Sequence, residues 1–310
     1  MTFHFGKRVA GNVMVRKIEI IVSAGDRCGE GIVWSEAESA LYWTDVTRFI
    51  IHRLNIASRS FHQWHFDQPV VALSRTTQPE TFLVALGSRL ILWNPRTDDR
   101  TDFGFTLDGW PAVRLNDGRT DPLGNFWIGS MANNVNADGS LATVNGKRGK
   151  LYKVNSTGEA SLWRDSIGIS NTLCWSPDFR RFYFADSLAN TIFTYDFDPE
   201  FGTIANEKPF FSDFARGCPD GSAMDSEGFL WNCRFGGGCI VRIAPDGQLD
   251  QVIEMPILNP TTCVFGGENL QTLFVTSASI LSEPSDRLAG SLFGVDVEAR
   301  GLPEFCFKLA

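Results

Sequence analysis

The chain of 310 residues carries a formal net charge of −8, and 43% of its residues are hydrophobic. This acidic balance argues against nucleic acid or an anionic membrane surface as the main partner. No apolar stretch approaches the roughly 18 residues that a membrane span needs, and no obligate protein partner is indicated. The seven cysteines are scattered without any C-x-x-C pair, which predicts reduced thiols in a cytoplasmic protein.

The N-terminal segment, residues 1–17, is mildly basic, and Lys17 and Glu19 interrupt what would otherwise be an apolar run. We therefore expect a short extension over residues 1–17, followed by a strand near Ile18–Val22. Residues 18–310 contain no linker and no shift of composition, so a single domain is predicted there.

Short runs of aromatic and β-branched residues recur along the chain, separated by Gly, Asp, Asn and Pro. Each repeat has a polar start, an apolar strand, a turn and a second aromatic strand, as in "GEGIVWSEAESALYWTD". Equivalent positions on the second strand lie roughly 40 to 57 residues apart, at Trp43, Val84, Trp127, Phe184, Trp231 and Val275. This interval is typical of four-stranded propeller blades. The pattern predicts an all-β fold, a six-bladed β-propeller of four-stranded blades, with the ring closed by the N-terminal strand.

Polar residues recur at one place in these repeats, just before the inner hairpin of each blade. In a propeller, the starts of the innermost strands converge at one end of the central channel. The position lies eleven or thirteen residues before the aligned second-strand residue, and it holds Glu30, Val71, Asn116, Asn171, Asp220 and Thr262. Two carboxylates and two amides are hard oxygen donors, which suit Ca²⁺, Mg²⁺ or Mn²⁺. Each residue alone could merely cap a strand, but their shared position favours a metal site.

Arg114 lies two residues before Asn116, so on a strand it should face the same way. A guanidinium there could hold a hydroxylated or anionic substrate or stabilise an oxyanion, whereas an ordinary surface salt bridge is the alternative. Asp117 is predicted to fix the strand–turn corner. Of the two Pro-Asp-Gly turns, the one with Asp220 lies before an inner hairpin, whereas Asp246 is predicted to sit in a simple outer hairpin.

The stretch "NVNADG" from Asn134 resembles the start of an EF-hand loop. The place twelve residues in is Asn145, where an EF-hand requires Glu, and no helix flanks it. We expect a flexible loop that overhangs the pocket.

The motifs around these residues resemble the senescence-marker-protein / regucalcin / gluconolactonase family of six-bladed propellers. They are "GEGIVW", "RLNDGRTDPLGNFWIGSMA", "SNTLCWSPD" and "CPDGSAMDSEGFLWN". The resemblance implies one divalent metal ion, with calcium as the first choice and zinc, manganese or magnesium as alternatives, bound by Glu30, Asn171 and Asp220. It also implies substrate contacts from Arg114 and Asn116. Asn134 joins them as a substrate-binding residue, because it stands where many members carry an acidic substrate contact.

The resemblance further implies hydrolysis of sugar-acid lactones, with the metal as Lewis acid and Asp220 as general acid/base. Two departures from the family pattern, Ile32 for a proline and Thr172 for a glycine, are expected to reshape the pocket wall. Alternatives are a calcium-binding regulatory or non-catalytic binding propeller and a phosphotriesterase-like hydrolase. Catalysis is favoured because Arg114 and Asn116 would serve no purpose at a purely structural metal.

Overall fold

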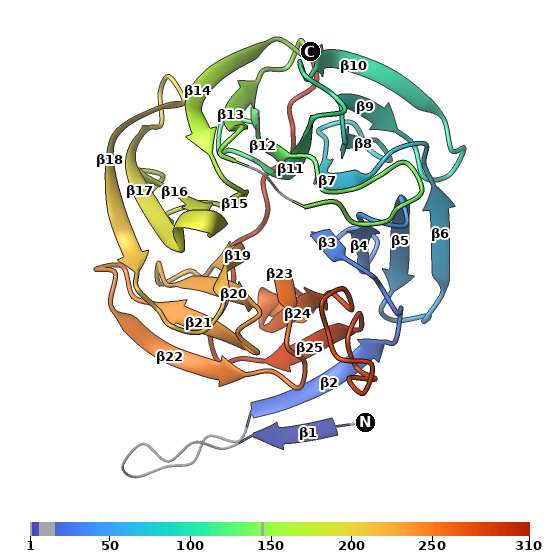
Figure 1. Cartoon of the computed structure of the whole chain (residues 1–310), viewed down its shortest axis with the longest axis vertical. Coiled ribbons are helices and arrows are strands. Elements are labelled where there is room, and N and C mark those ends of the chain that lie inside the picture. Colours follow the sequence, from blue (N-terminus) through green and yellow to red (C-terminus); the bar gives the residue numbers. More distant parts are fainter. Residues whose placement is uncertain (1, 6–15, 144–145) are drawn as a thin grey trace.

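A computed structural model describes residues 2–5, 16–143 and 146–310 of the chain. Six antiparallel sheets are arranged as blades around a central axis (Figure 1), which confirms the predicted six-bladed propeller. The described residues contain no α-helix, only the short 3₁₀ turns η1 (Ser187–Ala189) and η2 (Glu268–Leu270). No helix among them is long and apolar enough to cross a membrane.

Five of the sheets have four strands each, and their strands run from the axis outward in chain order. The first blade contains β3 (Gly29–Ser35), β4 (Ala40–Asp45), β5 (Ile50–Asn55) and β6 (Phe61–His65). The second contains β7 (Val70–Arg75), β8 (Phe82–Leu86), β9 (Arg89–Trp93) and β10 (Arg100–Thr106). The third contains β11 (Val113–Thr120), β12 (Phe126–Ala132), β13 (Gly149–Val154) and β14 (Ala160–Ile167). The fourth contains β15 (Ser170–Trp175), β16 (Arg181–Asp186), β17 (Thr191–Asp198) and β18 (Thr203–Ser212), and the fifth β19 (Cys218–Met224), β20 (Leu230–Phe235), β21 (Cys239–Ile243) and β22 (Leu249–Glu254).

The sixth sheet joins the two ends of the chain. Its order is β1-β2-β25-β24-β23, formed by β1 (Thr2–Phe5), β2 (Arg16–Val22), β23 (Pro260–Gly266), β24 (Thr272–Ser277) and β25 (Leu292–Asp296). Strand β2 pairs antiparallel with β25, and Ile18 lies opposite Val295, so the N-terminal strand closes the ring as predicted. Strand β1 adds a fifth strand outside β2. Residues 6–15 of the predicted extension lie outside the described residues, and its boundary at residue 17 stays a prediction.

The aligned second-strand residues form the repeating core of the blades. All six are buried on the second strands, with at most 1% of any one exposed: Trp43, Val84, Trp127, Phe184, Trp231 and Val275. A buried indole N–H needs an acceptor. Trp127 and Trp231 donate to Asp121 and Asp225, each over 2.9 Å.

Every innermost strand has a β-bulge near its start. The pairing register shifts between Glu30 and Val33, Val70 and Ala72, Leu115 and Gly118, Asn171 and Cys174, Pro219 and Ser222, and Pro260 and Cys263. A bulge bends its strand and re-aims the side chains beside it. The six bulges lie at or next to the positions where the sequence analysis placed the polar ring.

The C-terminal segment crosses the opposite end of the channel. Its backbone and Glu304 contact the far ends of inner strands from three blades: Leu302 N–H donates to Met224 O, Trp34 N–H to Glu304 Oε2, and Phe307 N–H to Arg75 O. The Phe307 side chain is fully buried. The segment therefore closes this end of the channel. The other end, where the inner strands start, is the open mouth.

Candidate metal and substrate site

A pocket of about 450 Å³ lies at the mouth formed by the starts of the inner strands. This volume is within the range of small-molecule sites. All six predicted site residues line it: Glu30, Arg114, Asn116, Asn134, Asn171 and Asp220. The other two ring positions, Val71 and Thr262, are buried and are not among the described residues that line the pocket. The repeat alignment thus brought together residues from four blades.

Glu30 and Asp220 place two carboxylates in this pocket, where the charge of Arg114 lowers the pKa of Glu30 and that of Arg234 lowers the pKa of Asp220 only in part. Neither forms an ion pair or a side-chain hydrogen bond within the described part of the chain, and each accepts only the N–H of the following glycine, Gly31 or Gly221. Burial raises the pKa of Glu30 well above its usual range, and the charges of Asp220 and Asp117 raise it further. The pKa of Asp220 is likewise raised well above its usual range by burial and then by Asp117. Buried like charges are unfavourable unless a cation joins them.

Asn171 is turned so that its amide oxygen is the free end. Its Nδ2 donates to Ser187 Oγ over 2.9 Å, and Ser187 Oγ donates to the Pro219 carbonyl over 2.6 Å. Its Oδ1 accepts only one longer bond, 3.2 Å from Asn116 Nδ2. The described residues contain no group of three or more His, Cys, Asp or Glu side chains able to hold a metal, so this amide oxygen completes the candidate set. Two carboxylates and one amide oxygen fit a hard divalent cation.

Arg114 is 5% exposed and is not the surface salt bridge that was one alternative. Its Nε and Nη2 donate to Asn134 Oδ1 over 2.9 and 2.8 Å, and its Nη1 donates to Asn116 Oδ1 over 2.6 Å and to Leu115 O over 2.8 Å. Four of the five guanidinium N–H groups are therefore used within the protein. Burial lowers the pKa of Arg114 to about 10, against the opposing influence of Cys28 and Glu30.

Both the oxygen and the nitrogen of the Asn116 side-chain amide form hydrogen bonds within the protein. Its Oδ1 accepts from Arg114, and its Nδ2 donates to Ser170 O over 2.8 Å and to Asn171 Oδ1 over 3.2 Å. Asn134 differs, because its Nδ2 has no hydrogen-bond partner among the described residues while its Oδ1 is held by Arg114. A chain of hydrogen bonds thus runs from Asn134 through Arg114 and Asn116 to Asn171.

Asp117 was expected at a strand–turn corner, but the bulge between Leu115 and Gly118 brings its charge close to the acidic pair. Its charge raises the pKa of both Glu30 and Asp220. Burial raises the pKa of Asp117 itself, while Arg119 and the N–H groups of Gly118 and Thr172 oppose this. Simple alternation along a strand missed this residue because a bulge interrupts the alternation.

Thr172 has a φ of 53°, in the left-handed region where a β-branched residue is rare. Its hydroxyl donates to the Asp220 carbonyl and also bonds Ser222 Oγ over 2.9 Å. The same Asp220 carbonyl accepts from Asn232 Nδ2 over 3.1 Å. Thr172 therefore ties the strand of Asn171 to that of Asp220. The second departure, Ile32, is buried in a hydrophobic cluster, and neither Ile32 nor Thr172 is among the described residues that line the pocket.

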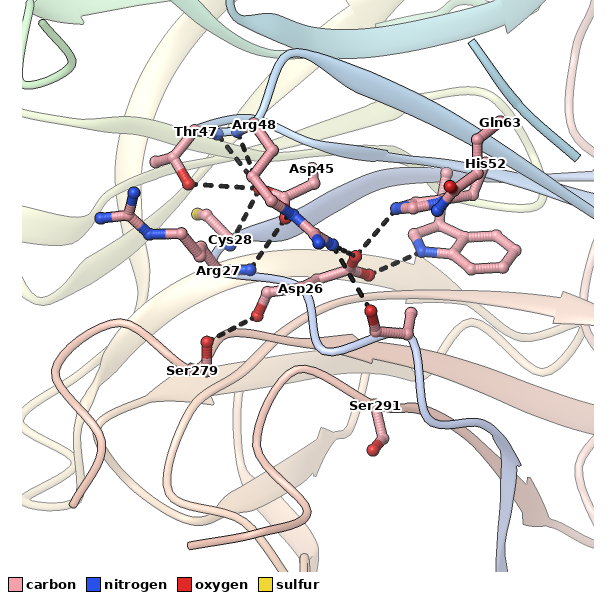
Figure 2. A network of polar contacts seen from close by, with 12 residues as sticks. Asp26, Arg27, Cys28, Asp45, Thr47, Arg48, His52, Gln63, Ser279 and Ser291 are labelled. Carbon is pink, nitrogen blue, oxygen red and sulfur yellow. Dashed lines mark hydrogen bonds and ion pairs between the residues drawn. The ribbon is translucent and has the colours of Figure 1, made fainter. Parts of the chain in front are cut away.

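A buried polar network fixes the chain as it enters the strand of Glu30 (Figure 2). Asp45 accepts from the backbone N–H groups of Arg27 and Cys28 over 2.8 and 3.3 Å. Arg48 joins Asp45 to Asp26, with contacts of 2.5 and 2.9 Å, and His52 Nε2 lies 2.8 Å from Asp26 Oδ1. The sequence analysis did not identify this network, although Asp26 stands four residues before Glu30.

The two loops of uncertain role have separate places. The loop after Asn134 reaches the pocket through Leu141, Ala142 and Thr143, whereas Asn145 lies outside the described residues. Asp246 is exposed in the turn between β21 and β22, and its Oδ1 accepts the Gln248 N–H over 3.0 Å. It is a simple outer hairpin turn, as predicted.

The fold and the pocket define a six-bladed propeller with oxygen donors at one mouth of its channel. Residues 28–279 match the SMP-30/Gluconolactonase/LRE-like region, and the chain belongs to this family. It is 28% identical to regucalcin of Sus scrofa over 93% of this chain and 97% of that protein. It is 31% identical to pentonolactonase XacC of Haloferax volcanii, over 92% of this chain and 96% of that protein. The structure of regucalcin from Agrobacterium tumefaciens, described as a calcium-binding protein, is similar with a TM-score of 0.87 at 26% identity, covering 95% of this chain and 97% of that one.

Proposed function

We propose that this protein is a divalent-metal-dependent lactonase that opens sugar-acid lactones. The observation that carries the proposal is that the half-buried Glu30 and the buried Asp220 share a pocket with the Asn171 oxygen and that neither carboxylate forms an ion pair within the described part of the chain. Membership of a gluconolactonase family and similarity to a pentonolactonase support lactone hydrolysis. No nucleophilic serine or cysteine is required.

Glu30, Asn171 and Asp220 would hold the metal. A bound divalent ion supplies Lewis-acid polarisation of a carbonyl and lowers the pKa of a water molecule. Asp220 takes the proton of the attacking water and delivers it to the leaving ring oxygen, as general base and then general acid. Arg114 and Asn116 keep the Asn171 oxygen in place, and the remaining N–H of Arg114 and the Asn134 amide orient the lactone, which makes the attack effectively intramolecular.

Calcium is the metal we favour, because oxygen donors alone suit a hard cation. The regucalcin from Agrobacterium tumefaciens is described as a calcium-binding protein, which supports the same choice. Zinc, which also accepts carboxylate oxygens, and manganese and magnesium are the alternatives.

The test is acid release from a panel of aldonolactones, followed with a pH indicator against an enzyme-free blank. We expect hydrolysis above the blank, loss of that activity with EDTA, and recovery when one of the four metals is added back. No acid release above the blank with any lactone and any of these metals would refute the proposal.

A non-catalytic calcium-binding propeller is the second candidate, favoured by the name regucalcin among the relatives. Calorimetry separates the two functions. Calcium binding without acid release from any lactone would establish the second candidate, whereas metal-dependent acid release would establish the first.

We also infer that the enzyme works in the cytoplasm as one domain over residues 18–310. All seven cysteines are free thiols, which is the usual state in a reducing compartment.

A further inference from the structure

Three buried charged residues lie opposite the strand starts that carry the proposed metal ligands. In each of these blades, the residue just before the ligand pairs with a charged residue of the second strand: Gly29 with Asp45, Ser170 with Asp186, and Pro219 with Arg234. The charged side chains are at most 2% exposed. The other three blades have neutral residues at this place: Leu86 opposite Val70, Ser130 opposite Leu115, and Thr276, whose hydroxyl bonds that of Thr261. Because burial of a charge is costly, its presence at this place in the ligand blades alone indicates a role beyond the fold.

The two aspartates bind the backbone that enters the ligand strand, and they do so in the same way. Asp45 accepts the N–H groups of the residues three and two positions before Glu30, over 2.8 and 3.3 Å (Figure 2). Asp186 accepts the N–H groups of the residues three and two positions before Asn171, over 3.0 and 3.2 Å. Hydrogen bonds to an ionised carboxylate are stronger than those between neutral groups. Each aspartate therefore holds the chain firmly just before a ligand.

Asp186 also fixes the residue that orients the Asn171 amide. Its Oδ1 accepts the N–H of Leu188 over 3.1 Å and so caps the 3₁₀ turn η1. This turn begins with Ser187, whose hydroxyl accepts from Asn171 Nδ2 over 2.9 Å and donates to the Pro219 carbonyl over 2.6 Å. Loss of the Asp186 carboxylate should therefore disturb both the strand entry and the orientation of the amide.

Arg234 binds the strand entry of the third ligand through carbonyl groups instead of N–H groups. Its Nε donates to Arg216 O over 3.1 Å and its Nη2 to Gly217 O over 2.7 Å, four and three residues before Asp220. The Nη2 also donates to Asn190 Oδ1 over 2.5 Å. Arg234 forms no ion pair within the described part of the chain, so neutral oxygens hold this guanidinium. Its charge serves the same purpose as the two carboxylates with the opposite sign.

The ligands need this support because a β-bulge interrupts the strand pairing beside each of them. The register shifts between Glu30 and Val33, between Asn171 and Cys174, and between Pro219 and Ser222. A bulge leaves a residue unpaired, so the ladder does not fix the ligand from the C-terminal side. Its position is then set from the N-terminal side, by the backbone that the three charged residues bind.

We propose that Asp45, Asp186 and Arg234 are positioning residues of the metal site, each of which fixes the backbone that leads into one ligand. The inference rests on the proposed function, because it takes the three proposed ligands as given. Loss of a partner that orients a metal ligand typically costs about 10–100-fold in metal affinity.

The first experiment measures calcium affinity by calorimetry, which does not depend on catalysis. Asp186→Asn leaves one acceptor oxygen for three N–H groups and should weaken calcium binding by about 10–100-fold. Asp121→Asn is the matched control: Asp121 is also fully buried and accepts two backbone N–H groups over 2.9 Å each, but it lies in the turn after β11, at the closed end of the channel. It should bind calcium as the wild type does. Equal affinities of the two variants would overturn the inference, and Asp45→Asn takes the place of Asp186→Asn if the latter does not fold.

The second experiment separates positioning from charge. Loss of a negative charge near a cation site weakens binding by itself, whereas loss of a positive charge strengthens it. Arg234→Met should nevertheless weaken calcium binding, by at least about tenfold, because the carbonyl groups before Asp220 lose their donor. Arg234→Lys keeps the charge without the forked donors and should also weaken binding, and it decides the question if Arg234→Met does not fold. Calcium binding that is unchanged or tighter in the folded variants would overturn the inference.

The wild type distinguishes failure of this inference from failure of the proposed function. If the wild type binds calcium, and Asp186→Asn and Arg234→Met bind it more weakly while no lactone is hydrolysed, the proposed function fails and the positioning role stands. Zinc, manganese or magnesium replaces calcium if the wild type does not bind calcium, and binding of none of the four metals overturns the inference. If lactones are hydrolysed, saturating metal should restore most of kcat in Asp186→Asn, because a positioning residue moves no proton. A kcat that stays a hundredfold low at saturating metal would overturn the inference.

Discussion

Substitution of Asp220 by Asn tests the centre of the proposed mechanism. The carboxylate lies in the pocket, while the Asp220 backbone is held separately, because its carbonyl accepts from Thr172 Oγ1 and Asn232 Nδ2. Asparagine should therefore leave the local structure intact. It removes a charged ligand and the proton acceptor, and general acid–base catalysis alone contributes about 10²–10⁴-fold. We expect kcat to fall by at least about a hundredfold.

The assay is acid release from the best lactone of the panel, with the metal varied up to saturation. Saturating metal should not restore kcat, because an amide cannot take up the proton near neutral pH. Asp246→Asn is the matched control: this aspartate also follows a proline and precedes a glycine, but it is exposed in an outer turn. Wild-type rates of Asp220→Asn in excess metal would show that Asp220 is only a ligand. Equal behaviour of the two variants would refute the assignment of Asp220 to the site.

Although Asp220→Asn should lower activity, the same substitution should raise the stability of the metal-free protein. In metal-free protein the raised pKa of Asp220 means that the folded state holds a proton that the unfolded chain releases above about pH 4. The free energy of unfolding of the wild type should therefore fall as pH rises above this value, through the raised pKa, and Asp220→Asn should flatten the dependence. Because asparagine is neutral without taking up a proton, the metal-free variant should be more stable than the wild type by about 0.5–2 kcal/mol at neutral pH. For 310 residues this corresponds to a rise in Tm of about 1–3 °C. If the variant had a lower Tm than the wild type, with both measured in EDTA, the raised pKa of Asp220 would be contradicted.

Three further predictions concern neighbouring residues. Glu30→Gln should weaken metal binding at least about tenfold in calorimetry, because a charged donor becomes neutral at unchanged size; unchanged affinity would show that Glu30 is not a ligand. Thr172→Val should lower the free energy of unfolding by about 1–3 kcal/mol, since the Asp220 carbonyl loses a buried donor, whereas Thr172→Ser should retain it; urea unfolding of both variants with equal midpoints would refute this role. Arg114→Lys should weaken metal binding by about 10–100-fold, because lysine cannot hold Asn134 and Asn116 together, and Asn116 in turn donates to the Asn171 oxygen. If only KM for the lactone changed, Arg114 would be a substrate contact and not a positioning residue.

The repeats in the sequence were sufficient to predict the propeller and the place of its pocket. Strand alternation and turn residues are local signals, and six copies at regular intervals define blades without knowledge of any distant contact. Because every blade has the same orientation about the axis, equivalent positions on the six innermost strands meet there. For this reason Glu30, Asn116, Asn171 and Asp220 could be grouped although they lie far apart in the chain, whereas only the family resemblance selected Glu30, Asn171 and Asp220 as metal ligands.

Other features of the site depend on contacts that leave no periodic pattern. The bulge in β11 reverses the alternation after Leu115, and this brings Asp117 to the acidic pair. The side-chain nitrogen of Asn116 donates to Ser170 O and Asn171 Oδ1, which both belong to the next blade. Sequence spacing shows which residues approach the axis, but not which hydrogen bonds remain for a ligand.

The closed end of the channel was also decided by the tertiary structure alone. Glu304 accepts from the Trp34 N–H across a separation of 270 residues, and the C-terminal segment that carries it pairs with the propeller only through isolated bridges. Its course is set by the unpaired backbone groups and the apolar surface at the far ends of the inner strands, and these exist together only once the ring has closed. The sequence by itself therefore determined the blades and the residues that approach the axis. Tertiary packing decided which mouth stays open and which polar groups within it remain free.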